Sequence, residues 1–297
     1  MRRQSLALIA FAAMVVLAGC GGGATTSTAT PTQTETEMQT PTATETVTVT
    51  ETATTTPTPT ETGDGSPAVT SAVLSAMQNV EAYHIDSNTT IVQSANNRQR
   101  TQRIIAEGMF DRAARELEVH NEIHVAGLTQ NTSVFFVDGT LYEHNPRYTS
   151  RYGSAWVKVN ASDAFFSQQD TLTRQRAFLA NATVTVAGTE LIEGNEVRVL
   201  NADVDEAATR EAIMARLGST GGQVNVTSVT QRLWVDTETN RPVRTTLSMN
   251  ATITAQGQTV DMTMDVRLSF DYDSSVSIEL PSEAQAAVSI GNSTDGS

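Results

Sequence analysis

Cysteine and lysine are almost missing from this chain of 297 residues. Its one cysteine, Cys20, excludes an internal disulfide framework and a cysteine-rich metal site. Lys158 is the only lysine, and 33 acidic residues against 19 basic ones give a net charge of −14. Because binding to phosphates needs clustered lysine and arginine, this balance argues against a nucleic acid as partner.

Apolar residues are also few, at 39% of the chain, and aromatic residues make up only 5%. Part of the chain is therefore expected to stay outside any core. The clearest such part is 24–62, where 20 of 39 residues are threonine and no residue is aromatic or basic. A threonine- and proline-rich tract of this kind is typical of an extended stalk, often O-glycosylated.

The N-terminus has the pattern of a secretory signal peptide. Arg2 and Arg3 precede an apolar run from Leu6 to Ala18, which is shorter than the roughly 20 residues that a transmembrane helix needs. The last two residues of this run and the two that follow form the motif Leu17–Cys20, which resembles the lipobox of prokaryotic lipoproteins. The resemblance implies export, a lipid on Cys20 and anchorage to the outer face of the cell membrane; the alternative is a free or buried cysteine behind an ordinary signal sequence.

These patterns divide the chain into five expected segments. They are a signal peptide at 1–19, a lipidated N-terminus at 20–23, a disordered Thr/Pro-rich stalk at 24–65, a folded domain at 66–290 and a disordered tail at 291–297.

Three helices are expected in the folded domain. Ser66-Pro67 is a helix-start signal, and apolar residues at helical spacing extend this helix to about Ala82. A second helix is expected from Ser162, as the capping residue, to about Asn181. A third opens at Asp205, carries Ile213, Met214 and Leu217 on its apolar side, and ends at Gly218.

The remaining pattern has a period of 2, which predicts antiparallel strands with one dry face and one wet face. The two longest are 243–253 and 260–272, whose length suggests a large curved sheet. Shorter strands are expected at 117–125, 134–137, 140–142, 156–159, 183–187 and 196–200, with tight turns at Asn96-Asn97, Asp138-Gly139 and Glu193–Asn195.

Two segments carry a resemblance to a known family. Leu233–Asp236, a polar turn and Pro242–Arg244, together with Phe270–Asp273 and Leu280-Pro281, resemble the LolA/LppX-like lipoprotein fold. The resemblance implies an α+β domain, in which an incomplete antiparallel β-barrel carries about three helices on its concave face and leaves a cavity for lipid chains. The acidic, lysine-poor composition resembles that of halophilic, haloarchaeal proteins.

The dry face of the two longest strands predicts where a hydrophobic ligand would lie. Methionine is frequent there, and methionine suits an adaptable apolar pocket. The expected cavity residues are Leu247, Met249, Met262, Met264, Val266 and Phe270, with Met214 from the third helix. The leading hypothesis is therefore an anchored lipoprotein that binds a lipid or other hydrophobic ligand. The alternative is a cell-surface interaction or envelope-sensor module with a filled core.

Enzyme motifs are lacking, so we expect neither an enzyme nor a cofactor. The best metal-ligand candidates, His120, Glu122 and His124, share a strand face, where the histidines would lie about 13 Å apart and could not bind one ion. Seven sequons occur, of which we expect only some to carry glycans; the candidates are Asn88, Asn131, Asn160 and Asn250. Arg98, Arg100 and Arg103 form a basic cluster that either balances nearby carboxylates or meets a lipid head group.

Overall fold

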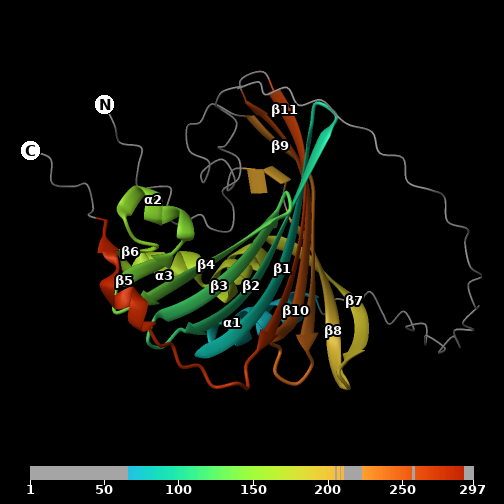
Figure 1. The fold of residues 1–297 in the computed structure, drawn as a ribbon. Helices are drawn as coiled ribbons and strands as arrows, with labels where there is room; N and C mark the ends of the chain where they lie inside the picture. The colour runs from blue at the N-terminus through green and yellow to red at the C-terminus, as the bar shows by residue number, and fades with distance from the viewer. Residues whose placement is uncertain (1–65, 205, 208, 211–222, 256–257, 291–297) are drawn as a thin grey trace, which may run out of the picture. The chain divides into compact units, whose positions relative to one another are not determined.

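The folded part of the chain is one large open sheet with helices on one face (Figure 1). The computed structural model describes residues 66–204, 206–207, 209–210, 223–255 and 258–290. The expected signal peptide, lipidated N-terminus, stalk and tail lie outside these residues. The described sheet has 12 strands in the order β12-β6-β5-β4-β3-β2-β1-β11-β10-β9-β8-β7. All neighbouring strands are antiparallel except β12, which pairs parallel with β6.

The strands are long in the middle of the sheet and short at the β12 edge. They are β1 Ala82–Ala95, β2 Arg98–Asp111, β3 Glu116–Val125, β4 Leu128–Val137, β5 Thr140–His144, β6 Trp156–Asn160, β7 Ala182–Ile192, β8 Asn195–Val204, β9 Gln223–Asp236, β10 Pro242–Ala255, β11 Gln258–Asp271 and β12 Val288–Ser289. The helices are α1 Ser66–Gln78, α2 Thr149–Tyr152, α3 Asp163–Gln169 and α4 Thr171–Ala180, with 3₁₀ turns η1 Pro146–Tyr148 and η2 Ser282–Ala286.

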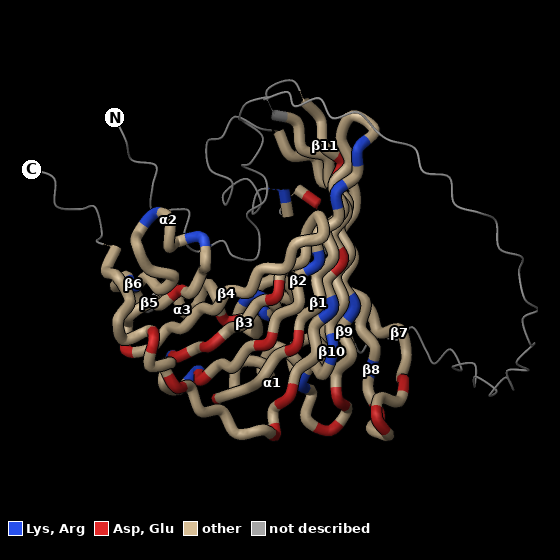
Figure 2. The backbone as a smooth tube through the Cα atoms, viewed as in Figure 1, with Lys and Arg blue, Asp and Glu red and all other residues tan. Residues whose placement is uncertain are grey.

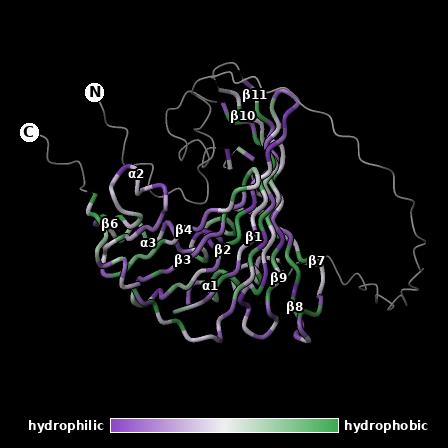
Figure 3. Tube along the Cα trace, viewed as in Figure 1, coloured by the Kyte–Doolittle hydropathy of each residue, from purple (hydrophilic) through white to green (hydrophobic). Residues whose placement is uncertain are grey.

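The expected α+β class is confirmed, as are the strands that the alternation predicted. The two longest expected strands are β10 and β11, and they pair antiparallel with Met249 opposite Met264. The alternation of hydrophilic and hydrophobic residues is visible along the neighbouring strands (Figure 3). The pattern did not reveal β1 and β2, because polar residues such as Ser87, Thr89 and Gln102 occupy positions that face the helices.

The expected turns are also present. Asn96 and Asn97 have φ of 50° and 60°, and Asp138 has φ of 49° before Gly139. Positive φ at both central residues matches the right-handed twist of the flanking strands, which is why Asn and Gly are favoured there.

The helices differ from the expectation in three respects. The helix expected from Ser162 to Asn181 is two helices, α3 and α4, because Asp170 between them has a non-helical ψ of 111°. Ser162 precedes α3 without a side-chain capping bond. Helix α1 ends at Gln78, not at Ala82. Of the third expected helix, residues 206, 207, 209 and 210 are described and are helical; Ile213, Met214 and Leu217 lie outside the described residues.

Helices α3 and α4 pack on one face of the sheet, which we call the inner face. The ring of Phe165 on α3 lies 5.4 Å from that of Phe136 on β4. Thr245 on β10 donates a hydrogen bond of 3.1 Å to Gln175 on α4, and both side chains are buried. The helical layer therefore reaches from β4 to β10 across the inner face, and the sheet curls around it (Figure 1).

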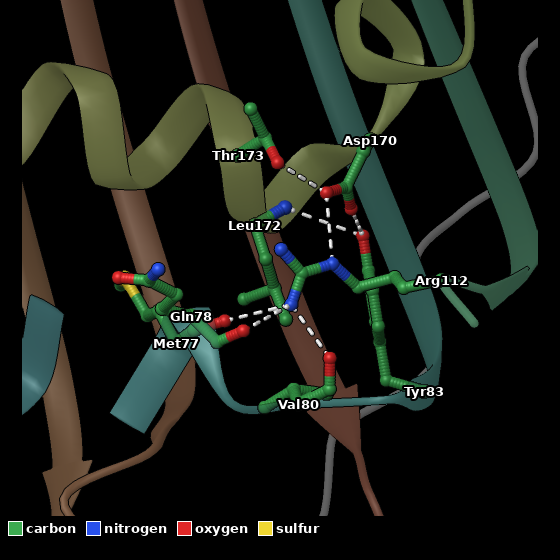
Figure 4. Close-up of polar contacts among 8 residues, drawn as sticks. All are labelled: Met77, Gln78, Val80, Tyr83, Arg112, Asp170, Leu172 and Thr173. Atoms are coloured by element: carbon green, nitrogen blue, oxygen red, sulfur yellow. Dashed lines mark hydrogen bonds and ion pairs between the residues drawn. The ribbon is translucent and has the colours of Figure 1, made fainter. Parts of the chain in front are cut away.

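A buried carboxylate, Asp170, ties this helical layer to the sheet (Figure 4). Its oxygens accept hydrogen bonds from Tyr83 on β1 and from Arg112 Nε, the latter at 3.0 Å. Arg112 Nη1 in turn donates to the carbonyls of Met77 at 2.9 Å and Val80 at 2.6 Å, at the end of α1. Burial and the Asp170 carboxylate raise the pKa of Tyr83 well above its usual value, so the phenol stays a donor.

We expect Asp170→Asn to lower the free energy of unfolding by about 3–5 kcal/mol, because it leaves the Arg112 guanidinium without its counter-charge. Denaturant unfolding followed by circular dichroism measures this. Glu107→Gln, on the exposed side of β2, is the matched control and should change stability by less than about 0.5 kcal/mol. Equal stabilities for the two variants would contradict a central role for the Asp170 network.

Candidate ligand-binding face

Five of the six described cavity candidates lie together on the inner face. Leu247 and Val266 are register partners on β10 and β11, as are Met249 and Met264. Met262 is opposite Ala251 one row further along. We call these five residues, 247, 249, 262, 264 and 266, the methionine cluster.

The methionine cluster is part of a larger apolar surface that involves five strands, including β7 through Ala182, and one helix. Phe178 of α4 packs against the methionine cluster, so this helix covers part of the cluster on the inner face. The buried neighbours on the strands are Ile91, Val224, Val226, Val229, Ala251 and Ile253.

Phe270, the sixth candidate, lies apart from this cluster. Its ring is parallel to that of Tyr272, with centroids 6.1 Å apart, and it lies 6.2 Å from the ring of Tyr83. It therefore belongs to the core beneath the Asp170 network. Met214, the candidate from the third helix, is outside the described residues.

Burial within the methionine cluster is graded. Met249 and Met264 are only 5% and 7% exposed, whereas Leu247, Met262 and Val266 are half-buried. On β1, the register partners of Val266 and Met262 are Thr89 and Gln93, which are also half-buried. The inner face thus keeps accessible apolar surface beside small polar side chains.

Gln231 on β9 supplies an unsatisfied polar atom at the edge of this surface. It is the register partner of Leu247 and is 5% exposed. Its Oε1 has no hydrogen-bond partner in the described part of the chain. A buried acceptor left without a donor costs about 1–3 kcal/mol, which a donor on a ligand would offset. The sequence offered a signal for Gln231, since it occupies an inward position between Val229 and Leu233.

No side chain of the methionine cluster titrates. The strongest pKa shift on a described acid is at Glu143 on β5, where burial raises the pKa to about 7 and a hydrogen bond from Tyr148 opposes this rise. The Tyr148 hydroxyl donates to Glu143 at 2.7 Å, and its own pKa is raised by burial and by the carboxylate. This pair belongs to β5 and η1, away from the methionine cluster.

The histidine candidates bind separate carboxylates. His120 Nε2 lies 2.6 Å from Glu118, and His124 Nε2 lies 2.9 Å from Glu122. Within the described ranges, no group of three or more His, Cys, Asp or Glu side chains is placed to hold a metal ion.

The four candidate glycosylation sites lie on four strands. Asn131 and Asn160 are exposed on β4 and β6. Asn88 on β1 accepts a hydrogen bond of 3.2 Å from Arg103, and Asn250 on β10 donates to Ser228 at 2.9 Å. The other two arginines of the basic cluster, residues 98 and 100, are exposed near the tip of the β1–β2 hairpin. Cys20 is outside the described residues.

Comparison with solved structures finds matches at low identity and low TM-score. The lipoprotein LppX of Mycobacterium tuberculosis is 12% identical, with 72% of this chain and 99% of LppX covered and a TM-score of 0.40. LprF of Mycobacterium bovis is 16% identical, with 73% and 98% covered and a TM-score of 0.40. A putative outer membrane lipoprotein-sorting protein domain of Vibrio parahaemolyticus is 8% identical, with 72% and 94% covered and a TM-score of 0.26. TM-scores below 0.5 support no inference about function.

The remaining findings are two sequence comparisons and one property of the described helices. A search of curated proteins found no match. Among the described helices, none is both long and apolar enough to cross a membrane. The model of a family of unknown function, DUF7537, matches residues 5–276, so the chain belongs to that family.

Proposed function

We propose that this domain binds an amphiphilic ligand, with an apolar chain and at least one hydrogen-bond donor, on the inner face of its sheet. The graded burial of the methionine cluster is the observation that carries this proposal. A closed core would bury its leucine and methionine side chains fully, because apolar surface left in water forgoes about 25 cal/mol per Å². Leu247, Met262 and Val266 instead retain accessible surface.

The polar atoms near the cluster favour an amphiphile over a pure hydrocarbon. The Gln231 acceptor has no donor within the described residues, and Thr89 lies next to Val266 across the β1–β11 pair. A ligand hydroxyl or amide placed at Gln231 would satisfy the acceptor while its chain covered the half-buried apolar side chains. Methionine side chains would adapt to the shape of that chain.

A different function is favoured by the other half of the same cluster. Met249 and Met264 of the cluster, and their neighbour Ala251, are each less than 9% exposed. If the rest of the inner face is closed in the same way, the domain is a filled module, and its partners are proteins that contact its exterior. The two proposals differ in whether space remains beside Val266.

We expect Val266→Trp to weaken binding of a pyrene-labelled fatty acid at least fivefold and to change the Tm by no more than about 2 °C. The indole would occupy the space that the ligand needs, next to Thr89 and Leu247. Fluorescence titration measures binding, and a thermal melt measures stability.

The control for this substitution is Thr101→Trp, at an exposed position of β2 that points away from the helices. It should leave the affinity for the fatty acid within twofold of the native value. Overpacking a filled core costs about 1–3 kcal/mol. A native protein that binds no probe, with a Tm several degrees lower in Val266→Trp, would therefore support the filled module instead.

We also propose that a lipid on Cys20 anchors the exported protein to the outer face of the cell membrane. The lipobox pattern at Leu17–Cys20 supports this. A single acyl chain binds a bilayer only marginally, so a two-chain lipid is the sufficient anchor. The 39 residues of 24–62 would hold the domain about 35 Å from the anchor as a coil, and about 120 Å as an extended stalk. The acidic, lysine-poor composition and the sequons support a halophilic surface glycoprotein.

Cys20→Ser should release the protein into the medium or leave it with its signal peptide attached, because serine has no thiol for the lipid. Membrane fractionation and the intact mass of the purified chain measure the two outcomes. Ser27→Ala, in the stalk, should change neither. If Cys20→Ser stays in the membrane and has a processed mass like that of the native protein, lipid anchorage through Cys20 is contradicted.

A further inference from the structure

The outer face of the sheet, opposite the helices, is hollowed into a polar trough. Its volume is about 1070 Å³, and side chains from six adjacent strands, β1, β11, β10, β9, β8 and β7, line it. Bulges bend β7 between Val186 and Gly188 and β9 at Thr227, opposite Asn250 and Ala251, and bulges increase local twist. At the usual strand spacing, six strands extend over about 24 Å.

A smaller pocket of about 330 Å³ adjoins the trough, and we call it the arginine pocket. Its lining is Trp234, Arg244, Thr246, Arg267 and Ser269. Thr246 and Arg267 also line the trough, so the two hollows are continuous.

Three arginines gather here in an acidic protein. Arg232 and Arg267 are both register partners of Thr246. Arg244 lies on β10, two residues before Thr246 in the sequence. None of the three forms an ion pair with a carboxylate among the described residues. In the Asp170 network, by contrast, Arg112 has its carboxylate at 3.0 Å. Figure 2 shows the basic segments grouped where β1, β2, β9 and β10 run together, while many acidic ones lie toward strand ends.

Trp234 holds two of these arginines in place. Its ring nitrogen donates to Glu190 at 2.8 Å, and it packs with Val197 and Val199 on the outer face, which leaves it 9% exposed. The Cζ atoms of Arg232 and Arg244 lie 5.4 Å and 5.9 Å from its ring. Cation–π contact with a fixed indole preorganises the guanidinium groups. Their planar donor forks match oxyanions with two or more oxygens.

The rest of the trough supplies hydroxyl, amide and carboxylate groups. The side chains that serve this role are Asn88, Thr90, Thr183, Thr185, Asn201, Asp203, Thr230, Ser248 and Asp265. Asp265 accepts a hydrogen bond from Ser248, and both of its neighbours in register, Thr90 and Ser248, carry hydroxyls. Such a lining offers many donors and acceptors beside the apolar Ala202, Val229, Leu247 and Val266, which suits a ligand that carries hydroxyl groups on a carbon skeleton.

We propose that the trough binds an acidic carbohydrate, with a sulfate or carboxylate group in the arginine pocket and sugar hydroxyls along the Asn, Thr and Asp lining. The polar side chains of this site alternate along β10 and β11 with those of the methionine cluster, so they face the other side of the sheet, and Leu247 and Val266 border both sites.

The test uses the full chain, produced without N-glycosylation because the sequon residue Asn88 lines the trough. Isothermal titration at constant salt compares three probes: a dextran sulfate oligosaccharide, neutral dextran of the same length and inorganic sulfate. We expect dextran sulfate to bind at least tenfold more tightly than either of the others. The double variant Arg244→Gln/Arg267→Gln should lower its affinity at least tenfold.

Two further variants make this result specific. Arg98→Gln/Arg100→Gln removes the same charge from the β1–β2 hairpin and should leave the affinity within twofold. Thr230→Trp fills the trough without a change of charge and should weaken binding at least fivefold. Equal losses from both arginine pairs would mean nonspecific attraction, and equal binding of inorganic sulfate would mean a simple anion site; either would overturn the proposal. Unchanged binding in Arg244→Gln/Arg267→Gln, with an unchanged melt, would overturn it as well.

Discussion

The carboxylate of Asp170 joins three elements that are far apart in the sequence, and the inner face depends on that junction. It accepts from Tyr83 on β1 and from Arg112, which follows β2, and Arg112 in turn holds the carbonyls at the end of α1. Asp170 also interrupts the helical run, so that α3 packs on β4 while α4 runs toward β10.

The alternation of side chains gives the sheet two surfaces with different chemistry. On β10 and β11 the inward residues are mainly apolar, with Thr245 as an exception, and the outward ones are mainly arginine, serine, threonine, asparagine and aspartate. Curvature closes the inner face around the helices, while bulges in β7 and β9 accompany a hollow on the outer face. A single sheet thereby carries an apolar surface and a polar trough back to back.

The period of 2 predicted the strands and the facing of the methionine cluster, because each strand with a clear alternation has one dry side. It could not place Phe270, since parity assigns a face but not a position along the strand. It missed β1 and β2, where Ser87 and Thr89 interrupt the apolar face. The break at Asp170 was also missed, because helical spacing continues on both sides of it and Arg112, which its carboxylate binds, is 58 residues away in sequence. The trough could not be predicted, because it is formed by six strands that pair side by side, and no local sequence pattern shows that pairing.

Native mass spectrometry of the full mature protein, released from membranes in detergent, tests the proposed hydrophobic ligand most directly. A lipid bound covalently to Cys20 stays on the chain under denaturing conditions, whereas a ligand held on the inner face leaves. We predict a native mass that exceeds the denatured mass by one discrete ligand, which organic extraction recovers as an amphiphile. Identical native and denatured masses, with no lipid extracted and no uptake of added fatty acid, would contradict the account.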